Sequence, residues 1–192
     1  MRMENLIRTI GLAAMLLLAA SPALSQGAGS EWDLLNQEVM SLYQKGQYDR
    51  AVIVAKKALA VAEKNAGQNH PDVATSLNNL AELYRTQGQY AQAEPMHRRA
   101  LAIREKALGP DHPDVAKSLN NLAVLYYAQG QYAQSEPLYK RALAIWEKAL
   151  GPDHPEVATS LENLAALYRN TGHGNEAQAL EKRAAAIRAI KR

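Results

Sequence analysis

The sequence contains no cysteine and no phenylalanine among its 192 residues. Without cysteine there is no disulfide, no thiolate ligand for a metal ion and no thiol nucleophile. A strong charge of one sign is also missing, because 22 Lys and Arg stand against 19 Asp and Glu, for a formal net charge of +3. These charges alternate along the chain instead of forming blocks. They offer no electrostatic case for nucleic acid, in spite of a pI near 9.1.

A hydrophobic run long enough to cross a bilayer is missing as well. The apolar stretch from Thr9 to Ala20 is too short for a transmembrane helix, which needs about 20 apolar residues. It follows a basic start ending at Arg8, and Pro22 and small residues up to Ser25 come after it. This layout predicts a secretory signal peptide over residues 1–25, cut after Ser25. The mature chain is then expected to be periplasmic or secreted without stable membrane insertion, and an uncleaved anchor is the alternative.

Internal repetition dominates the rest of the chain. The segment Gly109–Leu150 repeats the segment Gly67–Leu108, with 31 of 42 positions identical. A third copy begins at Gly151 and fades towards the C-terminus, and a degenerate copy ends at Gly46-Gln47-Tyr48. A fixed period of 20–50 residues is typical of solenoid proteins, in which each repeat packs only on its neighbours.

Each copy contains the signals of two helices. Leu77, Leu80, Ala81 and Tyr84 fall at i, i+3, i+4 and i+7, which is one face of a helix. Such a helix starts with a capping residue before proline, as in His112-Pro113.

Gly88 and Gly130 are expected to end these first helices in the left-handed conformation. After a lead-in at residues 26–31, the pattern predicts about four helical hairpins in residues 32–192. Their expected limits are 32–66, 70–108, 112–150 and 154–190. We call the first helix of each hairpin the A helix and the second the B helix.

Small residues at fixed spacing identify a family. Leu80-Ala81 is followed by Tyr84, by Ala93 twelve residues after Ala81, and by Ala100 seven residues later. This pattern resembles the tetratricopeptide repeat, and the 42-residue period resembles the type found in kinesin light chains and in exported bacterial proteins. The resemblance implies an all-α, right-handed superhelical solenoid. In it the A helices line a concave groove and the B helices form the convex side.

The end copies depart from this pattern. Tyr43 lies three residues before Gly46, whereas Tyr84 lies four before Gly88, so one residue is expected to be missing from the first hairpin. On that alignment Asn36 takes the place of Leu77, and the first A helix is shorter or shifted. At the other end, the segment from about Asn175 to Ile190 is expected to cap the stack with a polar outer face.

The histidines suggest a metal site, but their spacing opposes it. His70, His112 and His154 lie one repeat apart, so they are expected to cap separate loops rather than share one zinc ion. His97 matches Tyr139 in the next copy and is expected to be packed in the interior. No Ser-His-Asp set, phosphate loop or carboxylate pair stands outside the repeat pattern. We therefore expect no catalytic residue, no metal and no cofactor, and no enzyme activity.

The resemblance implies that polar A-helix residues face a peptide groove. Adjacent asparagines in mid-helix are unfavourable locally, because the amide competes for backbone hydrogen bonds. The alternative is that one asparagine of each pair bridges neighbouring A helices. The predicted groove residues are Thr75, Asn78, Asn79, Glu82, Arg85, Lys117, Asn120, Asn121, Val124, Tyr127, Thr159, Glu162, Asn163, Ala166 and Arg169.

The groove chemistry is mixed. Asn79, Lys117, Asn121 and Arg85 resemble part of a carboxylate clamp, but Glu162 and Val124 interrupt that set. We therefore expect a non-enzymatic interaction scaffold that holds a generic extended or helical segment of a partner protein, with no nucleic acid involved. A self-assembling solenoid without a peptide ligand, joined through its end caps or convex face, is the alternative, so a homo-oligomer is left open.

Overall fold

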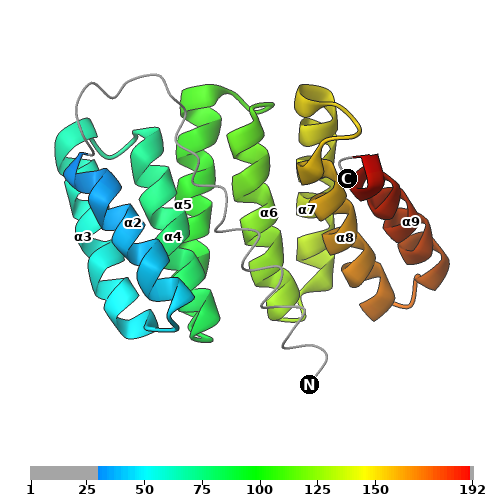
Figure 1. The fold of residues 1–192 in the computed structure, drawn as a ribbon, viewed down its shortest axis with the longest axis horizontal. Coiled ribbons are helices and arrows are strands. Elements are labelled where there is room, and N and C mark those ends of the chain that lie inside the picture. The colour runs from blue at the N-terminus through cyan, green and yellow to red at the C-terminus, as the bar shows by residue number, and fades with distance from the viewer. Residues whose placement is uncertain (1–29, 191–192) are drawn as a thin grey trace. The chain divides into compact units, whose positions relative to one another are not determined.

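The computed structural model describes residues 30–190. Within these residues the chain forms eight α-helices and no strand (Figure 1). The predicted signal peptide, residues 1–25, lies outside the described residues. The A helices are α2 (Glu31–Gln44), α4 (Pro71–Thr86), α6 (Pro113–Ala128) and α8 (Pro155–Asn170). The B helices are α3 (Tyr48–Ala66), α5 (Tyr90–Leu108), α7 (Tyr132–Leu150) and α9 (Gly174–Ile190). The all-α repeat array predicted from the sequence is confirmed.

The helices fall into two compact units. The first unit contains α2 to α5 as far as Ala107, and the second contains α6 to α9 from Leu108 onward. Within each unit, consecutive helices pack side by side in antiparallel pairs (Figure 1). This succession of neighbours is what a repeat array requires.

The expected helix signals are present at both ends. The backbone N–H of Asp72, Asp114 and Glu156 donates to Nδ1 of the histidine two residues earlier, at 3.2, 3.1 and 3.2 Å. His70, His112 and His154 are therefore N-caps followed by proline at the first helical position. At the C-terminal ends, Gly88 and Gly130 have φ of 74° and 72°. Both predictions are confirmed.

Alanines fill the seam between the helices of each hairpin. Ala81, Ala93 and Ala100 are fully buried, as are Ala123 and Ala142 in the next copy. In the first unit, Ala100 and Ile103 of α5 form one apolar cluster with residues of α4 and with Ala62 of α3. Short side chains at these positions permit the 8–10 Å separation that is typical of packed helices.

The first hairpin corrects one prediction. Its A helix is indeed shorter, with 14 residues in α2 against 16 in α4. However, Gln47 N donates to Leu42 O at 2.9 Å, as Gln89 N does to Tyr84 O at 2.8 Å. Leu42, and not Tyr43, is therefore the counterpart of Tyr84, and the predicted deletion was wrong.

The period of 42 residues consequently holds throughout. Asn36 is the counterpart of Asn78 and Asn120 and not of Leu77, and Tyr43 is the counterpart of Arg85. The mistake arose because tyrosine occupies adjacent positions in different copies, and only the backbone hydrogen bonds distinguish them.

Candidate functional site

The predicted groove residues lie on α4, α6 and α8, and they differ in their access to solvent. Most of them are buried, including both asparagine pairs and, three residues after each pair, Glu82 and Val124. Glu162 and Arg169 are exposed. Thr75, Lys117, Thr159 and Ala166 are partly exposed. Whether these residues contact a partner stays a prediction, but their internal contacts show which of them also hold the fold together.

Side-chain amides connect successive A helices. In the first unit, Asn79 Nδ2 of α4 donates to Asn36 Oδ1 of α2 at 3.0 Å. In the second unit, Asn163 Nδ2 of α8 donates to Asn120 Oδ1 of α6 at 2.9 Å. Each bond joins residues 43 positions apart. This bridging role, which the sequence left open as an alternative, is confirmed for these two bonds.

A tyrosine makes a further bond of the same kind. Asn170 Nδ2 of α8 donates to the Tyr127 hydroxyl of α6, and these residues are also 43 positions apart. The same offset therefore joins neighbouring A helices at two levels of the second unit. We call these contacts the A-helix ladder.

Breaking one bond of the A-helix ladder should cost stability. Asn163→Ala is expected to lower the free energy of unfolding by about 1–2 kcal/mol, because it leaves the buried Asn120 carbonyl without its donor. Urea denaturation measures this loss. Asn175→Ala on the exposed side of α9 is the matched control and should stay within about 0.5 kcal/mol of the parent. Equal losses in the two variants would mean that the bond contributes nothing.

The other asparagine of the first pair bonds within its own hairpin. Asn78 Oδ1 lies 2.8 Å from His97 Nδ1 of α5. His97 is fully buried, as predicted, and its Nε2 has no hydrogen-bond partner. Burial, together with the charges of Arg85 and Arg104, lowers the pKa of His97 to about 3. The imidazole is therefore neutral at pH 7 and carries its proton on Nδ1, directed at the amide oxygen.

Two of the predicted groove residues on α4 form an ion pair with each other. Arg85 binds Glu82 through two hydrogen bonds, of 2.8 Å from Nε and 2.6 Å from the terminal nitrogen, and both side chains are nearly fully buried. Burial acts to lower the pKa of Arg85, but the charge and hydrogen bonds of Glu82 outweigh it and raise the pKa. A guanidinium held by its own carboxylate is not free to clamp the carboxylate of a ligand, so this geometry does not favour the clamp.

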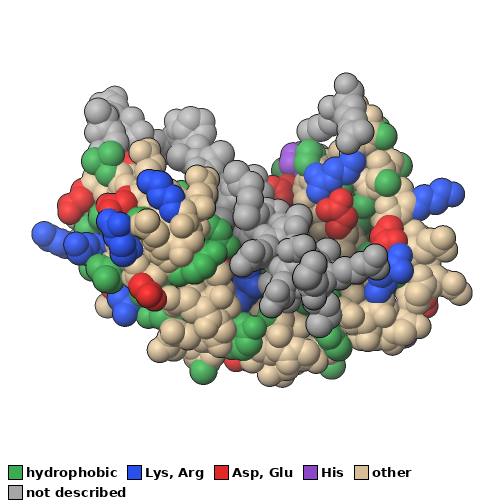
Figure 2. All heavy atoms as spheres, turned by 60° about the horizontal axis from the view of Figure 1, so that its bottom comes forward, with side chains coloured by type: hydrophobic (Ala, Val, Ile, Leu, Met, Phe, Trp, Pro, Cys, Tyr) green, Lys and Arg blue, Asp and Glu red, His purple; other side chains and the backbone are tan. Residues whose placement is uncertain are grey.

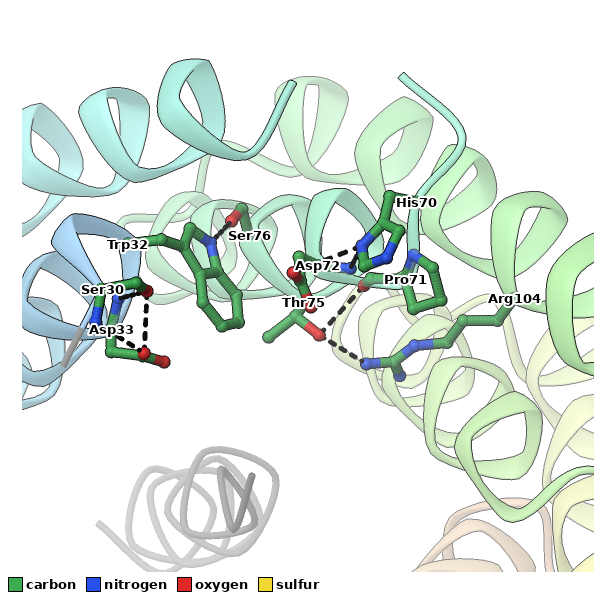
Figure 3. Close-up of polar contacts among 9 residues, drawn as sticks. All are labelled: Ser30, Trp32, Asp33, His70, Pro71, Asp72, Thr75, Ser76 and Arg104. Atoms are coloured by element: carbon green, nitrogen blue, oxygen red, sulfur yellow. Dashed lines mark hydrogen bonds and ion pairs between the residues drawn. The ribbon is translucent and has the colours of Figure 1, made fainter. Parts of the chain in front are cut away.

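Hydrogen bonds also join the N-terminal ends of the A helices to neighbouring helices (Figure 3). Trp32 Nε1 of α2 donates to Ser76 Oγ of α4 at 2.8 Å. Arg104 of α5 donates to Thr75 Oγ1 at 3.1 Å, and Thr75 in turn donates to the Pro71 carbonyl. The second unit repeats the arginine link, because Arg188 of α9 donates to Thr159 Oγ1 at 3.0 Å.

Charged groups remain accessible on the A helices of the second unit. The side chains of Lys117, Glu162 and Arg169 are 24, 46 and 57% exposed. Glu162 binds Arg188 of α9 through two hydrogen bonds, and Arg169 likewise binds Glu181 of α9. The hydrogen bonds from Arg169 lower the pKa of Glu181. These surface pairs are open to solvent, so a ligand can compete for them at little cost.

Neither a metal centre nor a membrane span emerges from residues 30–190. No group of three or more histidine, aspartate or glutamate side chains there is placed to hold a metal ion. No helix in the same range is both long and apolar enough to cross a bilayer.

Sequence reasoning left the bridging of A helices by asparagine open and missed the other contacts between hairpins. The sequence contains a signal for the offset of 43 residues in the A-helix ladder. The offset is one more than the period of 42, so each bond joins a polar residue of one copy to the polar residue one position further along in the next copy. A second offset joins B helices: Arg99 binds Glu63 at 2.7 Å and Arg183 binds Glu147, each pair 36 positions apart. Arginine recurs every 42 residues at the position of Arg99, and glutamate recurs every 42 residues at the position of Glu63.

Comparison with known proteins agrees with this geometry. Family models described as "Tetratricopeptide repeat" match residues 35–72 and 73–114, and another with the same description matches 114–189. No curated protein gives a match. Tetratricopeptide repeats in general are non-catalytic scaffolds for protein interactions.

Solved structures of repeat proteins are similar over nearly the whole chain. BtubC (BKLC) from P. vanneervenii has 28% sequence identity and a TM-score of 0.75, covering 98% of this chain and 72% of that one. The nearly identical TPR-like repeats of a putative kinesin light chain from Podosopora anserina have 26% identity and a TM-score of 0.67, covering 98% and 88%. With its 42-residue period, its alanine seams and its paired helices, this chain belongs to the tetratricopeptide-repeat family.

Proposed function

We propose that the chain is a non-enzymatic scaffold that holds a segment of a partner protein along its A helices. The observation that carries this proposal is the accessible set of charged side chains on α6 and α8, namely Lys117, Glu162 and Arg169. Asn120, Tyr127, Asn163 and Asn170 on these helices are instead bonded to one another in the A-helix ladder. In the repeat proteins that this chain resembles, the same surface of the A helices lines the concave groove.

The chemistry of this surface favours an extended or helical segment of mixed charge. Lys117 and Arg169 supply donors for acidic side chains or backbone carbonyls, and Glu162 accepts from a basic side chain or an N–H. Val124 and Tyr127 are buried beside them in one cluster with Leu164 and Leu167, so they support this surface from below. Because Arg85 is bound to Glu82, we propose recognition along the length of a segment rather than capture of a terminal carboxylate.

Binding of selected peptides tests the proposal. Peptides are selected on the immobilised mature chain from a random library, and their affinities are measured by calorimetry. Lys117→Ala combined with Arg169→Ala is expected to weaken binding at least about tenfold, which corresponds to about 1.4 kcal/mol.

Arg183→Ala combined with Lys140→Ala is the matched control. It removes two exposed cations from B helices, and both of these cations are paired with glutamates, as Arg169 is. The control should change the affinity less than about twofold, within the range of a rim charge. Equal weakening by the two double variants, or by neither, would overturn the assignment to the A helices.

The same proposal places the mature chain in the periplasm or outside the cell. Its support is the layout of residues 1–25 with cleavage after Ser25. Mass spectrometry of the exported protein should give a chain that begins at Gln26, and a chain that retains Met1 would point to the anchored alternative.

A further inference from the structure

The first A helix carries an acidic stripe where the other A helices carry an apolar one. In α4, the stripe of Val73, Ser76, Leu80 and Leu83 is buried. Ser76 accepts from Trp32, so this stripe faces the preceding hairpin. The counterparts 42 residues earlier in α2 are Glu31, Leu34, Glu38 and Ser41. Glu31 and Glu38 are exposed, and Leu34 between them is 58% exposed.

The first B helix carries a basic stripe. Residues at spacings of three and four share one face of a helix, and on α3 all members of one such row are exposed. The members of this row are Arg50, Ile53, Lys57, Ala60 and Lys64. Ile53, in the middle of its basic part, is 57% exposed.

Lys57 in the basic stripe lacks the carboxylate partner of its counterpart in the next copy, because Arg99 binds Glu63 at 2.7 Å. Lys64 corresponds to Lys106, which has no carboxylate partner among the described residues, and to Lys148 one copy later, which binds Asp111 at 2.6 Å. Across residues 30–190, neither Lys57 nor Lys64 meets a carboxylate. Arg50 bonds only to the neutral side chain of Gln47.

Both stripes border the same open end of the first unit. Arg99 reaches back to Glu63 in the preceding hairpin and to the Gln68 carbonyl in the loop after it, so this side of a B helix is directed towards the previous repeat. Lys57, its counterpart, has no earlier hairpin to reach within the described residues. Several Lys and Arg side chains lie at this edge of the first unit, on the α3 side (Figure 2).

We infer that this end binds a second copy of the chain, with α2 of each copy lying on α3 of the other. The acidic stripe with a central leucine is complementary to the basic stripe with a central isoleucine. In a two-fold dimer the acidic stripe of each copy contacts the basic stripe of the other, so the same surface is buried on both copies, as an isologous interface requires. An acidic partner protein would leave the acidic stripe of α2 unmatched, and the two apolar side chains of the α3 row, Ile53 and Ala60, are too few for insertion into a membrane surface. The interface is separate from the charged surface of α6 and α8.

The dimer should be weak and sensitive to salt. Helices of 14 and 19 residues extend only about 21 and 28 Å, which limits the buried area to the lower range of specific interfaces. Exposed charge pairs are screened beyond about 8 Å at physiological ionic strength.

Charge reversal with complementation tests the inference. Sedimentation equilibrium is measured for the mature chain, for Glu31→Lys with Glu38→Lys (the α2 variant), and for Lys57→Glu with Lys64→Glu (the α3 variant). The wild type should dimerise reversibly, less at high salt. Each variant alone should raise the dimer dissociation constant at least about tenfold, because both of its stripes then carry the same sign. An equimolar mixture should restore dimers, because each reversed stripe meets one of opposite charge.

Lys106→Glu with Lys182→Glu is the control, since it makes the same charge change as the α3 variant at exposed positions elsewhere. It should dimerise like the wild type, and circular dichroism should show that every variant is folded. Three outcomes would overturn the inference: a wild type that stays monomeric at all attainable concentrations, a mixture that does not recover, or a wild type that binds anionic vesicles without self-association.

Discussion

Acidifying the protein from pH 7 to pH 5 is expected to lower its free energy of unfolding by about 2 kcal/mol through His97 alone. In the folded protein, burial and the nearby Arg85 and Arg104 lower the pKa of His97 to about 3, whereas a histidine in the unfolded chain titrates near 6.5. Between these values the unfolded chain binds a proton that the folded chain does not. The contribution of His97 is therefore complete above pH 6.5 and is lost progressively as the pH falls towards 3.

The counterpart of His97 in the next copy provides the control. Tyr139 is 1% exposed and carries no proton to gain in this range. His97→Tyr should therefore flatten the dependence of stability on pH between 7 and 5, measured by urea denaturation at several pH values. If the variant and the parent lose the same free energy over this range, another group is responsible.

Replacing Ala100 with leucine is expected to destabilise the first unit by about 3 kcal/mol. Ala100 is fully buried and packs against Val73, Ala74 and Leu77 of α4. Extra carbon atoms in a tightly packed seam force the helices apart or the side chains out of their rotamers, at a cost of about 1–3 kcal/mol. The whole isobutyl group must fit between two helices here, so we expect the upper end of that range.

Ala102 lies two residues further along α5 and is exposed. Ala102→Leu adds the same atoms to the same helix, so it should change stability by less than about 0.5 kcal/mol. Denaturation midpoints of the two variants give the comparison. Similar midpoints would mean that the alanine seam does not set the distance between α4 and α5.

The helices could be predicted because their signals are local. The histidine caps, the prolines that follow them and the glycines at the C-terminal ends act within one turn of a helix, and they recur in each near-identical copy. The predicted start and end of the second B helix, Tyr90 and Leu108, agree with the structure. Where the copies diverge, as at Leu42 and Tyr43, local similarity no longer determined the alignment.

The contacts between hairpins could not be derived in the same way. That Asn79 bonds to Asn36 of the preceding A helix, and Asn78 to His97 of its own hairpin, depends on the packing of three helices. From the sequence, the two adjacent asparagines were equivalent candidates for ligand contact. The predicted groove set therefore combines residues with internal bonds, such as Asn163, with accessible ones, such as Lys117 and Arg169.

This division makes the functional proposal more specific. Buried members of the set, such as Asn79 and Asn120, change stability when they are replaced, so loss of binding in such variants does not identify a contact. Accessible members lie outside the A-helix ladder, so under our proposal their replacement should change binding without disturbing it. Variants for functional work are therefore best made at Lys117, Glu162 and Arg169.

Photo-crosslinking with a selected peptide tests most directly whether a partner lies along the A helices. A benzophenone side chain is placed at position 166 in α8 or at position 102 in α5, one on an A helix and one on the outer side of a B helix. Our account predicts a peptide adduct at position 166 that unlabelled peptide competes away, with none at position 102. An adduct at position 102 alone, or equal adducts at both positions, would contradict it.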